Sequence, residues 1–169
     1  MCLFVDLNYH KVKKHKPIAL VAKQSILVHK VLASDGKHYC TPCMYKAINF
    51  DDEYGMFFYK TTRFSIFFDD YDFKVLRGIH SYIDIGVAND AKKYFGNMDN
   101  PYTKSNVHYA IIPKGSKFYI GWRLIDIVSS NLVVFENEAK YNKNKDYFGD
   151  EPIEFSEYLR KFGTELDSK

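Results

Sequence analysis

The chain has 169 residues, of which 46% are hydrophobic and 17% aromatic. This composition excludes an intrinsically disordered chain and is sufficient for one domain to bury its own core. The formal net charge of +3 is too small to indicate nucleic-acid binding. The three cysteines are an odd number and do not form a disulfide framework, which is typical of a reducing compartment.

We expect a soluble protein of the cytoplasm, or of the host cytoplasm if the protein is viral. No apolar run approaches the roughly 18 residues of a membrane span. The N-terminus "MCLFVDLNYHKVKKHK" places its apolar residues before its charges, which is the reverse of a secretory signal.

The first strands are predicted after a basic N-terminal segment, residues 1–17, whose cations gather in "HKVKKHK". Residues 18–33 are rich in β-branched side chains and end at the turn signal Ser34-Asp35-Gly36, so we expect one or two strands there. The segment "YGMFFYKTTRFSIFF", residues 54–68, predicts two short aromatic strands around a turn.

A helix is predicted from Ser81 to Phe95, because apolar residues recur on one face at Ile83, Val87 and Ala91. Ser81 occupies the expected N-cap position, and Gly96 stands where the chain would leave the helix.

Two alternating runs follow, "VHYAII" and "KFYIGW", joined by Pro113-Lys114-Gly115-Ser116. Proline and glycine at these turn positions predict a β-hairpin. The segment "LIDIVSSNLVVF" predicts a further strand split around residues 129–131, and "IEFSEYLRKF", residues 153–162, predicts a short terminal helix.

These elements together predict an α+β fold, with a mainly antiparallel sheet packed against one central helix and a short C-terminal helix. We expect residues 18–136 to form the core domain. Residues 1–17 are the basic segment that precedes the core domain, and residues 137–169 are a polar linker followed by the C-terminal helix.

Four segments resemble a loose family of small bacteriophage and bacterial proteins: "VHKVLASDGKHYCTP", "RGIHSY", "IIPKGSKFYIG" and "DIVSSNLVVF". In that family, a Gly-x-His-Ser/Ala motif precedes a helix, and a Pro-Lys-Gly-Ser hairpin follows it. The likeness covers roughly residues 26–135 and implies a shared fold and a viral origin. This sequence departs from the family pattern at Ile79, where an aromatic residue is usual, and at Cys40-Thr41-Pro42-Cys43, around a Ser-Pro position.

Arg77, His80 and Ser81 are the first candidate ligand-binding residues. Arginine can bind a phosphate or carboxylate through two hydrogen bonds, and histidine titrates near neutral pH. A helix that starts at Ser81 would add backbone N–H groups for an anion. The alternative is a purely structural turn, in which glycine permits the turn, His80 bonds to buried backbone and Ser81 caps the helix.

Cys40 and Cys43 form a Cys-x-x-Cys pair that could bind zinc together with His38. A closed site needs a fourth ligand, which a distant histidine, His29, His80 or His108, could supply. The surrounding pattern does not match that of a thioredoxin-like motif. We therefore expect no metal or other cofactor and treat zinc as the alternative.

An arrangement like that of ADP-ribosyltransferases would need Arg77 or His80, the pair Ser129-Ser130, and a late acid. The candidate acids are Glu136 and Glu138. The sequence around them lacks a convincing supporting motif, so this enzyme is the third hypothesis.

The sequence favours a non-catalytic binding protein of phage type that acts in counter-defence. Its expected partner is a phosphorylated small ligand that it sequesters, or a host protein that it blocks. The alternative is a structural component of a virion or of its assembly, in which strand-rich surfaces pack against further copies of the chain. We expect neither nucleic acid nor a membrane as partner.

Overall fold

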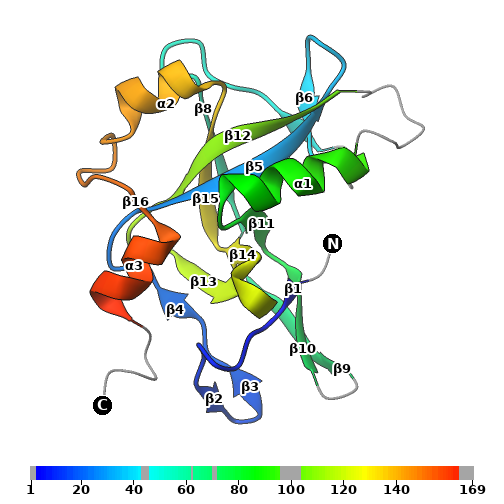
Figure 1. Ribbon diagram of the computed structural model, residues 1–169, viewed down its shortest axis with the longest axis vertical. Coiled ribbons are helices and arrows are strands. Elements are labelled where there is room, and N and C mark those ends of the chain that lie inside the picture. Colours follow the sequence, from blue (N-terminus) through cyan, green and yellow to red (C-terminus); the bar gives the residue numbers. More distant parts are fainter. Residues whose placement is uncertain (1–2, 43–45, 62, 70–71, 96–103, 164–169) are drawn as a thin grey trace.

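Antiparallel strand pairing dominates the fold, which the computed structural model describes for residues 3–42, 46–61, 63–69, 72–95 and 104–163 (Figure 1). The architecture is α+β, as the sequence predicts. The main sheet contains, in spatial order, β4 (Leu20–Val21), β13 (Lys117–Ile120), β14 (Asp126–Ser129), β11 (Ile79–Tyr82), β5 (Ile26–Ser34), β12 (Lys104–Ile112), β15 (Asn131–Phe135) and β8 (Met56–Lys60). Shorter strands extend it: β16 (Ile153–Glu154), β6 (Tyr39–Cys40) and β7 (Ala47–Ile48).

The centre of the main sheet is β5, which pairs with β12 over its whole length, from Ile26 opposite Ile112 to Ser34 opposite Lys104. The predicted strand region 18–33 thus contains two strands, β4 and β5, and ends at the predicted turn. The other edge of β5 pairs with three different segments along its length: β16, then β11, then β6.

A second, three-stranded sheet is formed by β1 (Leu3–Phe4), β10 (Asp72–Arg77) and β9 (Ser65–Asp69). The two aromatic strands predicted within residues 54–68 are β8 and β9, but they belong to different sheets. A separate hairpin is formed by β2 (Val12–Lys13) and β3 (Lys16–Pro17).

The basic N-terminal segment is folded against the rest of the protein from Leu3 onward. Leu3 and Val5 are buried, and β1 pairs with β10. His10 is also buried: its Nε2 accepts a hydrogen bond from the backbone N–H of Ile120 at 2.9 Å. These contacts connect the segment to the core domain.

The hairpin predicted at Pro113–Ser116 is wrong, although the turn itself forms. Ser116 N–H donates to the carbonyl of Pro113 at 3.0 Å, and Gly115 has a φ of +89°. On either side of this turn, however, β12 pairs with β15 and β13 pairs with β14. The chain reverses instead at the short turn η1 (Trp122–Leu124), in which Arg123 and Leu124 have positive φ, so the Pro-Lys-Gly-Ser segment is a bulge within one long bent hairpin.

The predicted interruption of the strand at residues 129–131 is confirmed, because Ser130 separates β14 from β15. Its N–H donates to the carbonyl of Lys117 at 2.8 Å, directly after the bulge on the facing strand. Both strands of the long hairpin therefore bend at the same level.

Helix α1 (Ile85–Phe95) begins four residues later than predicted, and the N-cap assigned to Ser81 is wrong. Ser81 lies in β11, whose backbone pairs with β14. The N-cap is Asp84, whose Oδ1 accepts a hydrogen bond from Val87 N–H at 2.9 Å. Helical periodicity does not locate the start of this helix, because pairing with the distant strand β14 holds residues 79–82 in an extended conformation.

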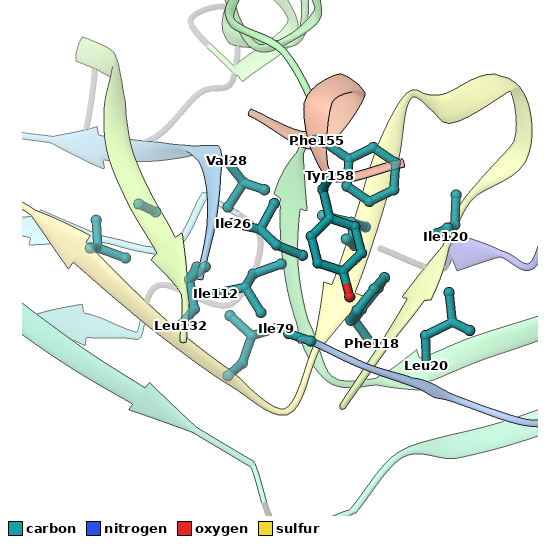
Figure 2. Packing of buried hydrophobic residues seen from close by; sticks show 14 of the residues in the cluster. Leu20, Ile26, Val28, Ile79, Ile112, Phe118, Ile120, Leu132, Phe155 and Tyr158 are labelled. Carbon is teal, nitrogen blue, oxygen red and sulfur yellow. The ribbon is translucent and has the colours of Figure 1, made fainter. Parts of the chain in front are cut away.

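The described part of the chain contains two further α-helices, α2 (Glu138–Asn144) and α3 (Phe155–Phe162). The second of them confirms the predicted terminal helix, whereas α2 forms within the predicted polar linker, capped by Asn137. Figure 2 shows Phe155 and Tyr158 of α3 beside Phe118 in the core. None of the helices in the described ranges is long and apolar enough to cross a membrane.

Candidate functional site

The segment Arg77-Gly78-Ile79 connects the two sheets, since β10 ends at Arg77 and β11 begins at Ile79. Gly78 has a φ of +147°, and a Cβ at this position would overlap the Cγ1 of Val128. The bend at this position therefore needs glycine for both backbone conformation and space, as the purely structural alternative expects. Among the described residues, however, His80 and Ser81 do not have the partners that this alternative gives them.

Arg77 and His80 line the same pocket, which has a volume of about 380 Å³. Ser81 is not among the described residues of its lining. Ser81 is 1% exposed, and the alternation of a β-strand directs it to the opposite side from His80. The structure thus brings together two of the three residues that the sequence singles out.

The pocket lies where two strands separate along one edge of β5. At this edge β11 pairs opposite His29, while β6 pairs opposite Ala33 and Ser34. Lys30 and Val31 lie between these two pairings and line the pocket. The rest of the lining consists of residues 59–61 at the end of β8, residues 76–78 at the end of β10, residues 79, 80 and 82 of β11, and residues 41, 42 and 46.

Four cationic side chains line the pocket, Lys30, Lys46, Lys60 and Arg77, and none of its described lining residues is acidic. Nζ of Lys30 donates a hydrogen bond to the backbone carbonyl of His80 at 2.6 Å. Nζ of Lys46 lies 4.4 Å from the ring centre of Tyr59. An excess of positive charge around a concave site raises the local concentration of anions.

Neither ring nitrogen of His80 has a hydrogen-bond partner among the described residues, and both are buried. Burial, and secondly the positive charge of Lys30, lower the pKa of His80 to about 3. The expectation that His80 titrates near neutral pH is therefore wrong, since a buried imidazole beside a cation loses its proton easily. At neutral pH His80 offers one N–H donor and one acceptor nitrogen.

A second basic pocket, of about 400 Å³, shares Thr61 with the first. Its cations are Lys16, Arg63 and Lys117, and its described lining again contains no acidic residue. Positive charge therefore extends beyond the pocket of Arg77 and His80.

The predicted zinc alternative is only partly within the described residues, because Cys43 lies outside them. Cys40 is 1% exposed, and burial raises the pKa of its thiol. His38 is exposed and its Nδ1 lies 3.1 Å from Oδ2 of Asp35. Within the described ranges, no three His, Cys, Asp or Glu residues are grouped closely enough to hold a metal ion.

The residues considered for an ADP-ribosyltransferase do not line one described pocket together, although Ser129 pairs opposite Ile79 in the β11–β14 ladder. Arg77 and His80 line the first pocket, Ser130 lines the second basic pocket, and Glu138 lines another pocket near α2. Ser129 is completely buried in β14, and Glu136 follows the end of β15.

Sequence reasoning did not find Lys30, Lys46 and Lys60. Lys30 carries a recognisable signal, because it is a single cation within the otherwise mostly apolar strand "ILVHKVLAS". Lys46 and Lys60 carry no such signal, since lysines at strand ends are commonly only solvated.

The chain matches no protein-family model, and no curated protein or solved structure proves significantly similar to it.

Proposed function

We propose that the protein is a non-catalytic binding protein that takes up a phosphorylated small ligand in the pocket of Arg77 and His80. The observation that carries this proposal is the charge of the pocket: four cations and, among the described lining residues, no carboxylate. Phosphate groups are dianionic or nearly so at neutral pH, and they are the ligands that such a site favours.

Arg77 provides the planar donor pair that suits two phosphate oxygens, and Lys60 supplies a second charge at the exposed side. Lys30 is positioned by its bond to the His80 carbonyl. Neither buried ring nitrogen of His80 has a hydrogen-bond partner in the described part of the chain, so this ring can bond to ligand groups that enter the pocket. Tyr59 and Leu76 offer apolar surface for the organic part of the ligand.

We propose binding rather than turnover because of the groups that surround the ligand. Among the described lining residues there is no carboxylate and no thiol, and a histidine with a pKa of about 3 is a poor general base at neutral pH. A ligand can be held in this pocket without a recognisable nucleophile and base beside it.

The resemblance to bacteriophage proteins suggests the biological setting of this proposal. A small binding protein of a phage could sequester a phosphorylated molecule of its host and so act in counter-defence within the host cytoplasm. Blocking of a host protein is the related possibility that the same resemblance suggests.

A virion or assembly component is the second candidate, and it is favoured by exposed aromatic side chains. Phe58, Phe67 and Phe68 are 54%, 41% and 60% exposed, and such side chains can be buried between copies of a chain. Native mass spectrometry of the purified protein tests this alternative: a stable homo-oligomer without bound nucleotide favours it over sequestration.

The direct test is calorimetric titration of the full chain with adenosine monophosphate and, as the uncharged counterpart, adenosine. We expect the monophosphate to bind at least about tenfold more tightly, because a phosphate bound by arginine and lysines contributes charge-assisted hydrogen bonds. Arg77→Ala should weaken binding by about tenfold and leave the melting temperature nearly unchanged, since the side chain is exposed.

Lys143→Ala is the matched control, because it removes an exposed cation on α2 that is not part of the lining. If adenosine binds as tightly as its monophosphate, or if the Lys143 variant loses as much affinity as the Arg77 variant, the proposed site is wrong.

A further inference from the structure

A second site is indicated on the opposite side of β5, independently of the anion pocket. His29 and Lys30 are neighbours on this strand, so their side chains point to opposite faces. Lys30 lines the basic pocket, while His29 lines a different pocket of about 550 Å³. Residues that precede or belong to α1, α2 and α3 surround the pocket of His29. Figure 1 shows these three helices arranged around β5 and β12.

The inner wall of this pocket is aromatic. The rings of Tyr109 and Tyr141 are 4.9 Å apart between centroids, and those of His29 and Tyr109 are 5.4 Å apart. The electron-rich faces of tyrosine rings attract organic cations, most strongly where water is excluded.

His29 is an unpartnered polar group in this wall. The residue is 6% exposed, and its buried Nδ1 has no hydrogen-bond partner among the described residues. A buried polar atom of this kind is costly unless a ligand or water satisfies it. Burial lowers the pKa of His29, so the ring is neutral at neutral pH and has one nitrogen that can accept a hydrogen bond.

The outer rim of the pocket is acidic. Asp84, Glu138 and Glu154 come from three separate segments, and Arg123 is the single Lys or Arg side chain within the described lining. In the described ranges no three such groups are close enough to bind one metal ion. Carboxylates that are spread around a large pocket suit an extended cation with several charged centres better than a compact ion.

We propose that this pocket binds an organic polyamine, with one ammonium group at the tyrosine wall near His29 and another between the carboxylates of the rim. The inner ammonium donates a hydrogen bond to His29 and contacts the ring of Tyr109. The outer ammonium interacts with Glu138 and Glu154, which lie on α2 and at the start of α3.

The test is calorimetric titration of the full chain with spermidine, and in parallel with magnesium chloride alone. We expect saturable binding of spermidine that magnesium at equal ionic strength does not abolish. Glu138→Gln and Glu154→Gln should each weaken spermidine binding by about fivefold, the effect of one partly exposed charge. His29→Phe keeps an aromatic ring and removes the acceptor, and should weaken binding by about tenfold.

Glu157→Gln is the matched control, since Glu157 is an exposed carboxylate of α3 outside the lining, 3.4 Å from Arg160. Binding should remain unchanged in this variant. The proposal is overturned if spermidine gives no saturable heat, if magnesium competes as effectively as a polyamine, or if the control variant loses as much affinity as Glu138→Gln. Because the rim glutamates are exposed, their variants test the site even if His29→Phe does not fold.

Discussion

Gly78 is the single residue between β10 and β11, and its conformation allows the chain to pass from one sheet to the other. Gly78→Ala should lower the free energy of unfolding by about 3 kcal/mol or more, because the methyl group overlaps Val128 and the φ of +147° is strained for alanine. Urea denaturation measures this change. Gly115→Ala is the control: its φ is also positive, at +89°, but nothing lies within 4 Å of the added carbon, so the loss should be only about 1 kcal/mol.

Asp126 is a second residue whose environment predicts a measurable effect. Burial raises the pKa of its carboxyl from 3.8 to about 6. The folded protein therefore binds this proton more tightly than the unfolded chain, and the contribution of Asp126 to stability decreases as the pH rises from about 4 to 6.

Asp126→Asn should consequently raise the free energy of unfolding by up to about 3 kcal/mol at pH 7 and change it little at pH 3. Thermal denaturation of both proteins across this pH range measures the difference. The exposed Asp52 serves as the control site through Asp52→Asn. A gain for Asp126→Asn that is equally large at pH 3 would contradict the assigned cause.

Two hairpins reverse direction through pairs of non-glycine residues with positive φ, a conformation that such residues rarely adopt. The pairs are Lys14-His15, with φ of 50° and 63°, and Arg123-Leu124, with φ of 58° and 54°. Two consecutive positive φ values are the pattern of a type I′ turn, which strongly prefers Asn-Gly. Arg123 and Leu124 line the proposed polyamine pocket, so their strain coincides with a candidate site.

The turn between β2 and β3 offers the cleaner measurement, because Lys14 and His15 are both exposed. The double substitution Lys14→Asn, His15→Gly should raise the free energy of unfolding by about 1 kcal/mol, since it relieves backbone strain at both positions. The melting temperature reports the gain. His15→Val should have the opposite sign, because a β-branched residue tolerates positive φ poorly, and a stabilised valine variant would refute the argument.

Cooperative unfolding of the two sheets can be measured through a single tryptophan. Trp122, the only tryptophan of the chain, lies where the N-terminal segment meets the β13–β14 turn. Its Nε1 donates to the carbonyl of Val5 at 3.0 Å, and its ring centre is 5.2 Å from that of Phe4. Its fluorescence therefore reports on this junction, while far-UV circular dichroism reports on all strands.

We expect the two signals to give coincident urea transitions, as in a two-state protein. His10→Ala should shift both midpoints together by an amount equal to about 2 kcal/mol, because it leaves the buried N–H of Ile120 without its acceptor. A fluorescence transition that precedes the loss of strand signal would show that the N-terminal segment unfolds separately.

Local features of the sequence were sufficient for the α+β class, the strand β5 with its terminal turn, the helix α3 and the need for glycine at residue 78. Each of these depends on residues close together in the chain, through side-chain periodicity or through a backbone conformation that glycine permits. The start of α1 and the supposed hairpin at Pro113 were predicted incorrectly, because distant strands decide how residues 79–82 and 107–120 pair.

Only the tertiary structure decided the candidate sites. The cations of the basic pocket come from β5, β8, β10 and the segment before β7, and no spacing in the sequence relates them. Ser81 faces away from this pocket although it is next to His80, because neighbouring residues of a strand point to opposite sides. By itself, the sequence determined which segments form strands and helices, since that information is local; the pairing of those segments determined which charges share a pocket.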